Sequence, residues 1–171
     1  MAPHPRRLFD QAPRPRNGQG GEATLKELLL PSPEATFAFG ERIGNKARGG
    51  LVLALRGGLG AGKTLLAKGI ARGLGIDEEV TSPTYTIVSE YQGRLRFHHV
   101  DAWRLSDADE FAAVGAADIL SDQGGVVAIE WSEKVTELLP PGTVGIELEV
   151  RDDDSRLALL SGPIPDDWLA P

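Results

Sequence analysis

A glycine-rich loop that ends in Lys-Thr is the segment whose residue types and spacing most clearly predict chemistry. Residues 57–64 read Gly-Gly-Leu-Gly-Ala-Gly-Lys-Thr and match the phosphate-binding pattern G-x-x-x-x-G-K-[ST] of a P-loop. Glycines let backbone N–H groups turn toward phosphate oxygens, and the N-terminus of the following helix adds a positive dipole end. The predicted contacts of a nucleotide are Gly57, Gly58, Leu59, Gly60, Ala61, Gly62, Lys63, Thr64 and Leu65.

Two side chains of this loop have separate predicted tasks. Lys63 adds a point charge for the phosphates and is a candidate catalytic residue, and the hydroxyl of Thr64 is expected to ligate magnesium. The alternative is a glycine-rich turn that contains Lys-Thr by chance. Residues 51–55 form an apolar run typical of a buried parallel strand, and residues 63–74 have helical spacing. Because strand, loop and helix agree, the phosphate-binding interpretation is favoured.

Two acidic residues follow other predicted strands and are candidates for metal binding and catalysis. Glu130 follows the apolar residues 126–129, and Asp101 follows residues 95–100. Magnesium in such sites takes a carboxylate from a neighbouring strand, directly or through water. We expect Glu130 to join Thr64 at the metal and Asp101 to orient the attacking water or support the metal shell. Either acid could instead only cap a strand end, which is common in α/β sheets.

A hydroxyl-rich segment lies beyond the helix of the P-loop. Its predicted switch or partner-binding residues are Ser82, Pro83, Thr84, Tyr85 and Thr86. Switch segments of nucleotide-binding proteins become ordered around phosphate and metal, although a plain connection from loop to strand explains the pattern equally well. Trp131, beside Glu130, is a further candidate switch or partner-binding residue. It is expected either to pack over the site or to be a buried edge aromatic.

His98 and His99 occupy adjacent positions of a predicted strand. Successive side chains of a strand point to opposite faces, so the two rings cannot both bind one metal. We expect a structural role for both.

The pattern of elements predicts the α/β class: a single-domain P-loop NTPase with a central, mostly parallel sheet flanked by helices, plus antiparallel hairpin strands. The helix after residue 32 has an N-cap serine and a proline at its first position. Other predicted elements are strands at 24–30, 84–91 and 95–100, a short helix at 133–138, and a closing hairpin of 144–150 with 156–160.

The chain has 171 residues and no cysteine, which is enough for one domain and excludes disulfides and thiolate chemistry. Residues 1–22 are rich in proline and arginine and are expected to be a disordered tail. The ATPase domain is expected at 23–161 and a C-terminal tail at 162–171. No apolar run reaches the roughly 20 residues that span a bilayer, so a soluble, cytoplasmic protein is expected.

The net charge of -7 argues against a direct grip on nucleic acid, which needs clustered Lys and Arg. Any contact with nucleic acid is expected to be indirect, through a partner protein. The cofactor is expected to be ATP, with Mg²⁺, because the Asn-Lys pair at 45–46 lies before the P-loop, whereas the guanine-reading element of GTPases follows it.

Four motifs in this order resemble the bacterial TsaE (YjeE) family, the small ATPase component of tRNA threonylcarbamoyladenosine synthesis. They are residues 57–64, 82–86, 99–105 and 129–131. The resemblance implies an ATPase of slow intrinsic turnover that joins the TsaD and TsaB subunits and supports threonylcarbamoyl transfer to the adenosine next to the anticodon.

The resemblance also implies roles for single residues. Thr64 and Glu130 look like magnesium ligands, Asp101 like a residue needed for hydrolysis, and Thr36 and Arg156 like the adenine side of the pocket. The sequence departs from the family at Gly58, where aspartate is usual, and at Leu65, where a second threonine is usual. Two other functions stay open from the residues alone: a small-molecule kinase that uses the same loop, and a nucleotide-dependent binding module without hydrolysis.

Overall fold

A computed structural model describes residues 25–81 and 86–170 of the chain. The strands are β1 (Lys26–Leu30), β2 (Leu51–Arg56), β3 (Val88–Gln92), β4 (Arg96–Asp101), β5 (Gly125–Glu130), β6 (Val144–Val150) and β7 (Arg156–Ser161). The α-helices are α1 (Pro33–Lys46), α2 (Lys63–Gly73), α3 (Ala108–Ala113) and α4 (Ala116–Leu120), and two 3₁₀ helices are η2 (Ser132–Leu138) and η3 (Asp166–Trp168). No helix within these residues has the length and apolar character that crossing a bilayer requires.

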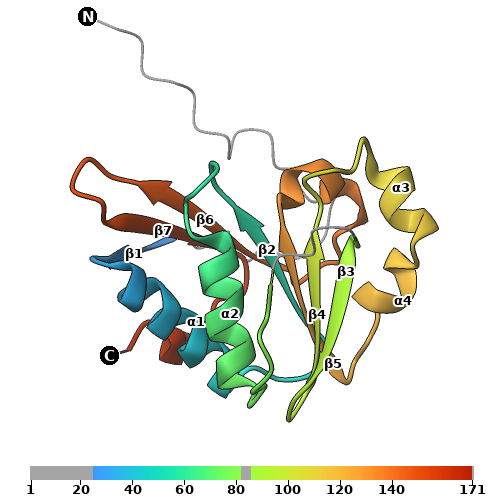
Figure 1. Cartoon of the computed structure of the whole chain (residues 1–171), viewed down its shortest axis with the longest axis horizontal. Helices are drawn as coiled ribbons and strands as arrows, with labels where there is room; N and C mark the ends of the chain where they lie inside the picture. The colour runs from blue at the N-terminus through green and yellow to red at the C-terminus, as the bar shows by residue number, and fades with distance from the viewer. Residues whose placement is uncertain (1–24, 82–85, 171) are drawn as a thin grey trace, which may run out of the picture.

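The strands form one sheet with the order β1-β7-β6-β2-β5-β4-β3 (Figure 1). β2 lies in the middle and is parallel to both β6 and β5, and β4 is parallel to β5. The pairs β1/β7, β6/β7 and β3/β4 are antiparallel. This arrangement confirms the predicted fold class. Because β2, β4 and β5 run in the same direction, their carboxyl ends, and the residues that follow them, meet at one edge of the sheet.

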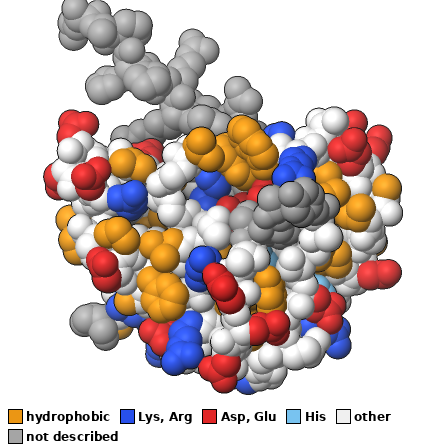
Figure 2. All heavy atoms as spheres, in the orientation of Figure 1, with side chains coloured by type: hydrophobic (Ala, Val, Ile, Leu, Met, Phe, Trp, Pro, Cys, Tyr) orange, Lys and Arg blue, Asp and Glu red, His pale blue; other side chains and the backbone are white. Residues whose placement is uncertain are grey.

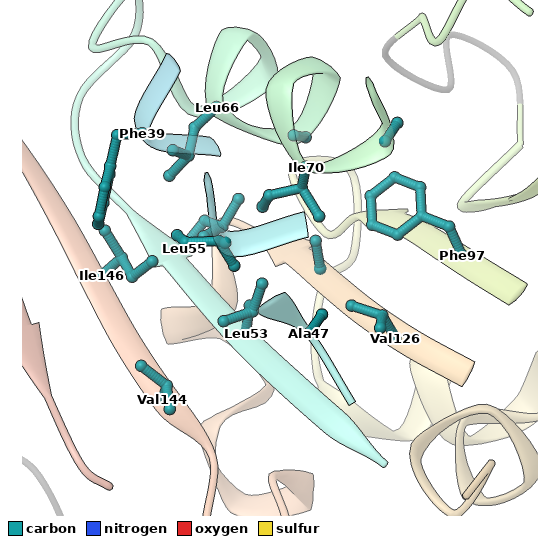
Figure 3. Close-up of a cluster of buried hydrophobic side chains, with 14 of the residues drawn as sticks. Phe39, Ala47, Leu53, Leu55, Leu66, Ile70, Phe97, Val126, Val144 and Ile146 are labelled. Carbon is teal, nitrogen blue, oxygen red and sulfur yellow. The ribbon is translucent and has the colours of Figure 1, made fainter. Parts of the chain in front are cut away.

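Helices cover the two faces of the sheet, and neighbouring residues of the parallel strands contribute to different cores. Leu53 and Leu55 of β2 pack with residues of α1 and α2 such as Phe39 and Ile70 (Figure 3). Val52 of β2 instead packs in a second cluster with residues of α3, α4 and η2. A strand buried on both faces is apolar without interruption, which is why residues 51–55 and 126–129 could be predicted as strands.

Helix α1 begins and ends as its sequence predicts, and it lies unusually close to α2. Ser32 Oγ accepts a hydrogen bond from Ala35 N at 3.2 Å, so Ser32 is the N-cap before Pro33. Where the helices touch, the contact is between backbones: a Cβ on Gly69 would lie 2.2 Å from the carbonyl oxygen of Phe37, and one on Gly44 would lie 2.1 Å from that of Ile70. Glycine at this crossing therefore fixes α1 against the helix that follows the P-loop.

The structure differs from the sequence-based expectation at the C-terminus. Residues 162–171 were expected to form a tail, but Trp168 of η3 is only 2% exposed and belongs to the core cluster of α1 and α2. Arg42 of α1 donates to the carbonyl oxygen of Trp168 at 3.1 Å, and Lys46 lies 3.3 Å from Asp167. The buried Trp168 ring supplies much of the apolar area that docks this segment, and Ile164 and Leu169 pack against the same core.

Two other expectations fall wholly or partly on residues that the structure does not describe. The predicted disordered tail at 1–22 lies outside the described residues. The strand predicted at 84–91 corresponds to β3, Val88–Gln92. Residues 82–85, which include the predicted start of this strand, also lie outside the described residues.

Candidate functional site

The glycine-rich loop connects β2 to α2, and its backbone explains where glycine is needed. Gly57 has φ of 137° and Gly62, the N-cap of α2, has φ of 106°, which are conformations that other residues rarely adopt. A Cβ on Gly57 would also lie 2.6 Å from the carbonyl oxygen of Leu148 in β6. At Gly58, in contrast, no atom lies within 4 Å of a Cβ, so the chain tolerates a side chain there.

Lys63 is buried among groups of its own loop. It is 5% exposed, and its Nζ donates to the carbonyl oxygens of Gly57 at 2.7 Å and Gly58 at 2.9 Å. The ammonium also lies 3.9 Å from the centroid of the Trp131 ring, a cation–π distance. Burial lowers the pKa of Lys63, and the carboxylates of Glu130, Glu133 and Asp101 oppose that shift.

Thr64 and Glu130 are in direct contact. Thr64 Oγ1 lies 2.9 Å from each carboxylate oxygen of Glu130, and Glu130 is only 3% exposed. β5 ends at Glu130, whose neighbour in the parallel β4 is Asp101. The three oxygen-bearing residues thus come from α2, β5 and β4 and meet at the edge where the phosphate loop begins.

Two tryptophans lie beside these acids. Trp131 is one of two non-glycine residues in the described chain with positive φ, at 58°, and such conformations are costly and concentrate at functional sites. Its ring lies 4.4 Å, centroid to centroid, from that of Trp103. The backbone N–H of Trp103 donates to Asp101 Oδ1 at 2.9 Å, so the loop after β4 holds the second acid and the aromatic pair together.

These groups line one cavity of about 290 Å³. Its lining residues are Leu59, Gly60, Gly62, Lys63, Thr64, Leu65, Asp101, Trp103, Glu130 and Trp131. Two larger hollows have volumes of about 480 and 640 Å³. Neither is lined by Lys63, Thr64, Asp101 or Glu130. We assign the functional site to the smaller cavity because the charged and hydroxyl groups converge there.

The donor set of this cavity suits magnesium in company with phosphate. Among the described residues, no cluster of three or more His, Asp or Glu side chains could hold a metal ion. Mg²⁺ needs no such cluster, because it keeps several waters and is bound by one or two protein oxygen groups plus substrate phosphates. Thr64 and Glu130 offer a hydroxyl and a carboxylate side by side, which fits that requirement.

Comparison with known proteins agrees with this geometry. The family model "Threonylcarbamoyl adenosine biosynthesis protein TsaE" matches residues 30–158. The chain belongs to the TsaE family. Relatives named tRNA threonylcarbamoyladenosine biosynthesis protein TsaE include that of Treponema pallidum, 43% identical over 125 residues, covering 73% of this chain and 92% of the relative. That of Bacillus subtilis is 40% identical over 126 residues, covering 73% and 78%.

A solved structure has the same fold. The crystal structure of YdiB from Bacillus subtilis superposes with a TM-score of 0.72 at 32% sequence identity, over 84% of this chain and 88% of that one. The family model and the named relatives confirm the resemblance inferred from four motifs.

Thr36 and Arg156, which the TsaE resemblance places at the adenine side, both lie against the P-loop. A Cβ on Gly62 would lie 3.6 Å from Thr36 Cγ2. Arg156, at the start of β7, donates to the carbonyl oxygens of Ala61 at 3.3 Å and Gly60 at 3.4 Å. The structure thus brings both residues next to the predicted phosphate loop.

The predicted switch segment is described only at its end. Ser82, Pro83, Thr84 and Tyr85 lie outside the described residues, and Thr86 is exposed ahead of β3. The switch role of this TsaE segment stays a prediction.

His99 and Trp103 are the site residues that sequence reasoning missed. His99 Nε2 lies 2.7 Å from Glu130 Oε1, whereas His98 contacts Asp122 at 2.9 Å, away from the cavity. The opposite orientations were predicted, but both rings were given a structural role only. The available signal was the two-residue spacing of His99 and Asp101, which places them on the same face of β4.

Charges are mixed on the face of this TsaE family member that Figure 2 shows. On the face in Figure 2, Lys and Arg side chains are interspersed with Asp and Glu and do not gather in one basic patch. With the net charge of -7, this face has no electrostatic footprint of a sequence-independent nucleic-acid binder.

Proposed function

We propose that this protein is a magnesium-dependent ATPase of slow intrinsic turnover that acts with TsaD and TsaB in threonylcarbamoyl transfer to the tRNA adenosine next to the anticodon. The observation that carries the proposal is the contact of Thr64 with Glu130 beside the buried Lys63. Membership of a family named for tRNA threonylcarbamoyladenosine biosynthesis supports it. The mixed charges support contact with tRNA through the partner proteins.

The residues of the cavity divide the work as follows. Backbone N–H groups at the N-terminus of α2 bind the phosphates, and Lys63 turns from the carbonyl oxygens of Gly57 and Gly58 to a phosphate oxygen. Thr64 and Glu130 hold magnesium, which neutralises charge on the phosphates. Asp101, at the adjacent strand end, orients the attacking water. Thr36 and Arg156 form the nucleoside side of the pocket.

The test is reconstitution of the modification with purified components. Cognate TsaD and TsaB receive ATP, magnesium, threonylcarbamoyl-adenylate and tRNA, with and without this protein. We expect modified tRNA over repeated cycles only when the protein is present, and loss of that effect with Asp101→Asn. An equal yield without the protein would refute the proposal.

The products separate the remaining alternatives. A phosphatase-free assay that detects a phosphorylated small molecule, in place of free phosphate, would identify a kinase. Full support of tRNA modification by a variant that releases no phosphate, such as Asp101→Asn, would identify a binding module that acts without hydrolysis.

A further inference from the structure

His99 is a buried side chain whose hydrogen-bond partner among the described residues is the carboxylate of Glu130. The residue is 0% exposed in β4, and its Nε2 lies 2.7 Å from Glu130 Oε1. Its ring is stacked on Phe97, with centroids 6.0 Å apart and planes 13° apart. Packing on one side and the carboxylate on the other therefore fix the ring orientation.

The second ring nitrogen shows which tautomer the protein holds. Among the described residues, His99 Nδ1 is buried without a hydrogen-bond partner. A proton on Nδ1 would leave a buried donor unpaired, which is costly, and would take the donor away from Glu130. The neutral ring with its proton on Nε2 avoids both costs. We therefore assign His99 as a hydrogen-bond donor to Glu130.

Glu130 thus receives hydrogen bonds from two elements. Its Oε1 is approached by His99 of β4 and by Thr64 of α2, and its Oε2 also lies 2.9 Å from Thr64 Oγ1. The carboxylate belongs to the last residue of β5, where the backbone turns into the strained Trp131. His99 thus holds Oε1 from the side of the sheet, and Thr64 contacts both oxygens from α2.

We infer that His99 is a positioning residue: through its Nε2–H it holds the Glu130 carboxylate where it can share magnesium with Thr64, and so it sets the magnesium affinity of the nucleotide-loaded protein. The inference rests on the proposed function, because it requires that nucleotide and magnesium bind at this site. Partners of metal ligands in other proteins act in this way, and their loss weakens metal binding by about 10- to 100-fold.

The experiment compares His99→Phe with a matched control, His98→Phe. Both replace a buried histidine of β4 that contacts a carboxylate, but His98 contacts Asp122, away from the cavity. Full-length proteins are loaded with a non-hydrolysable ATP analogue without metal, and Mg²⁺ is titrated while tryptophan fluorescence is recorded. We expect the midpoint to rise about tenfold or more in His99→Phe and to stay near the wild-type value in His98→Phe.

Two further readouts separate positioning from a general structural role. Affinity for the analogue without magnesium should be unchanged in His99→Phe, and His99→Gln, which keeps an N–H donor, should recover most of the magnesium affinity. An unchanged midpoint in His99→Phe, or an equal change in His98→Phe, would overturn the inference.

A measurement on the wild-type protein keeps the inference testable if His99→Phe does not fold. Nitrogen-15 NMR of the histidine rings should show His99 as the Nε2-protonated tautomer, and an Nδ1-protonated ring would overturn the assignment. A wild-type protein that binds no analogue would refute the proposed function and this inference together. A normal wild-type response with an unaffected His99→Phe would refute this inference alone.

Discussion

The ammonium of Lys63 lies 3.9 Å from the centroid of the Trp131 ring while it donates to two carbonyl oxygens of its own loop. Trp131 directly follows Glu130, and its backbone adopts positive φ there. The end of β5 therefore supplies both the carboxylate beside Thr64 and the aromatic cover of Lys63. A phosphate that enters the loop has to compete with the carbonyl oxygens of Gly57 and Gly58 for the same ammonium.

Replacement of this lysine should strongly weaken nucleotide binding. In Lys63→Ala a bound phosphate loses a charged hydrogen-bond donor, worth about 1.5–3 kcal/mol. This corresponds to roughly 10- to 100-fold weaker ATP binding, to be measured by isothermal titration calorimetry. Lys68→Ala, on the same helix but outside the cavity lining, is the control and should bind ATP normally. Equal affinities of the two variants would contradict the assigned phosphate site.

The close crossing of α1 and α2 should not accept a methyl group. Gly69→Ala gains about 1 kcal/mol in helix propensity, but its Cβ would lie 2.2 Å from the carbonyl oxygen of Phe37. Because that atom is backbone, the helices must separate, and we expect a net loss of roughly 1–2 kcal/mol in the free energy of unfolding. Urea unfolding checks this. Gly58→Ala, which meets open space, should stay within about 0.5 kcal/mol of wild type.

The docked C-terminal segment should contribute to global stability. Trp168 is 2% exposed, and truncation of a buried aromatic to alanine costs about 3–5 kcal/mol. We expect a loss of that size for Trp168→Ala in chemical denaturation. Trp103→Ala is the matched control, since Trp103 is 52% exposed, and should lose much less. Similar unfolding of Trp168→Ala and wild type would show that residues 162–170 do not stabilise the domain.

A charged cluster near the start of β4 should make the free energy of unfolding depend on pH. Asp122 Oδ2 lies 2.9 Å from both His98 Nε2 and Arg96 Nη1, and Glu90 faces the same histidine. The hydrogen bond with His98, followed by that with Gly124 N, lowers the pKa of Asp122 below its ordinary value of 3.8. A lowered carboxylate pKa stabilises the fold above the ordinary value, and this contribution is lost as pH falls through the folded-state pKa.

Asp122→Asn should therefore unfold more easily than wild type at neutral pH, and the difference should shrink toward the acid limit of folding. Urea unfolding over this pH range measures it. The control is Asp118→Asn, a carboxylate in the same hollow. A difference between Asp122→Asn and wild type that does not change with pH would contradict the electrostatic explanation.

Local patterns made much of the fold predictable. The apolar residues 51–55 and 126–129 become β2 and β5 because both faces of these strands are covered. The N-cap at Ser32 and the P-loop depend on neighbours in sequence, so their geometry could be read directly. The convergence of Lys63, Thr64, Asp101 and Glu130 followed from the rule that parallel strands end at one edge.

Contacts that depend on register or on distant packing could not be predicted in this way. His99 meets Glu130 because β4 lies beside β5 in one particular register, and nothing local to His99 specifies that neighbour. Trp168 fills a space bounded by α1, which lies more than a hundred residues earlier in the chain. A short polar segment with one tryptophan reads as a tail unless the space that receives it is known.

The placement of the tryptophans has an optical consequence. Of the three in the chain, Trp103 and Trp131 line the cavity beside the P-loop, whereas Trp168 lies in the hollow formed at the starts of β2 and β6. Ultraviolet emission from the protein therefore comes from two separated regions, and one conservative exchange, Trp168→Phe, would leave only the pair beside Lys63. The intrinsic fluorescence of such a protein would report the occupancy of its phosphate loop without any attached dye.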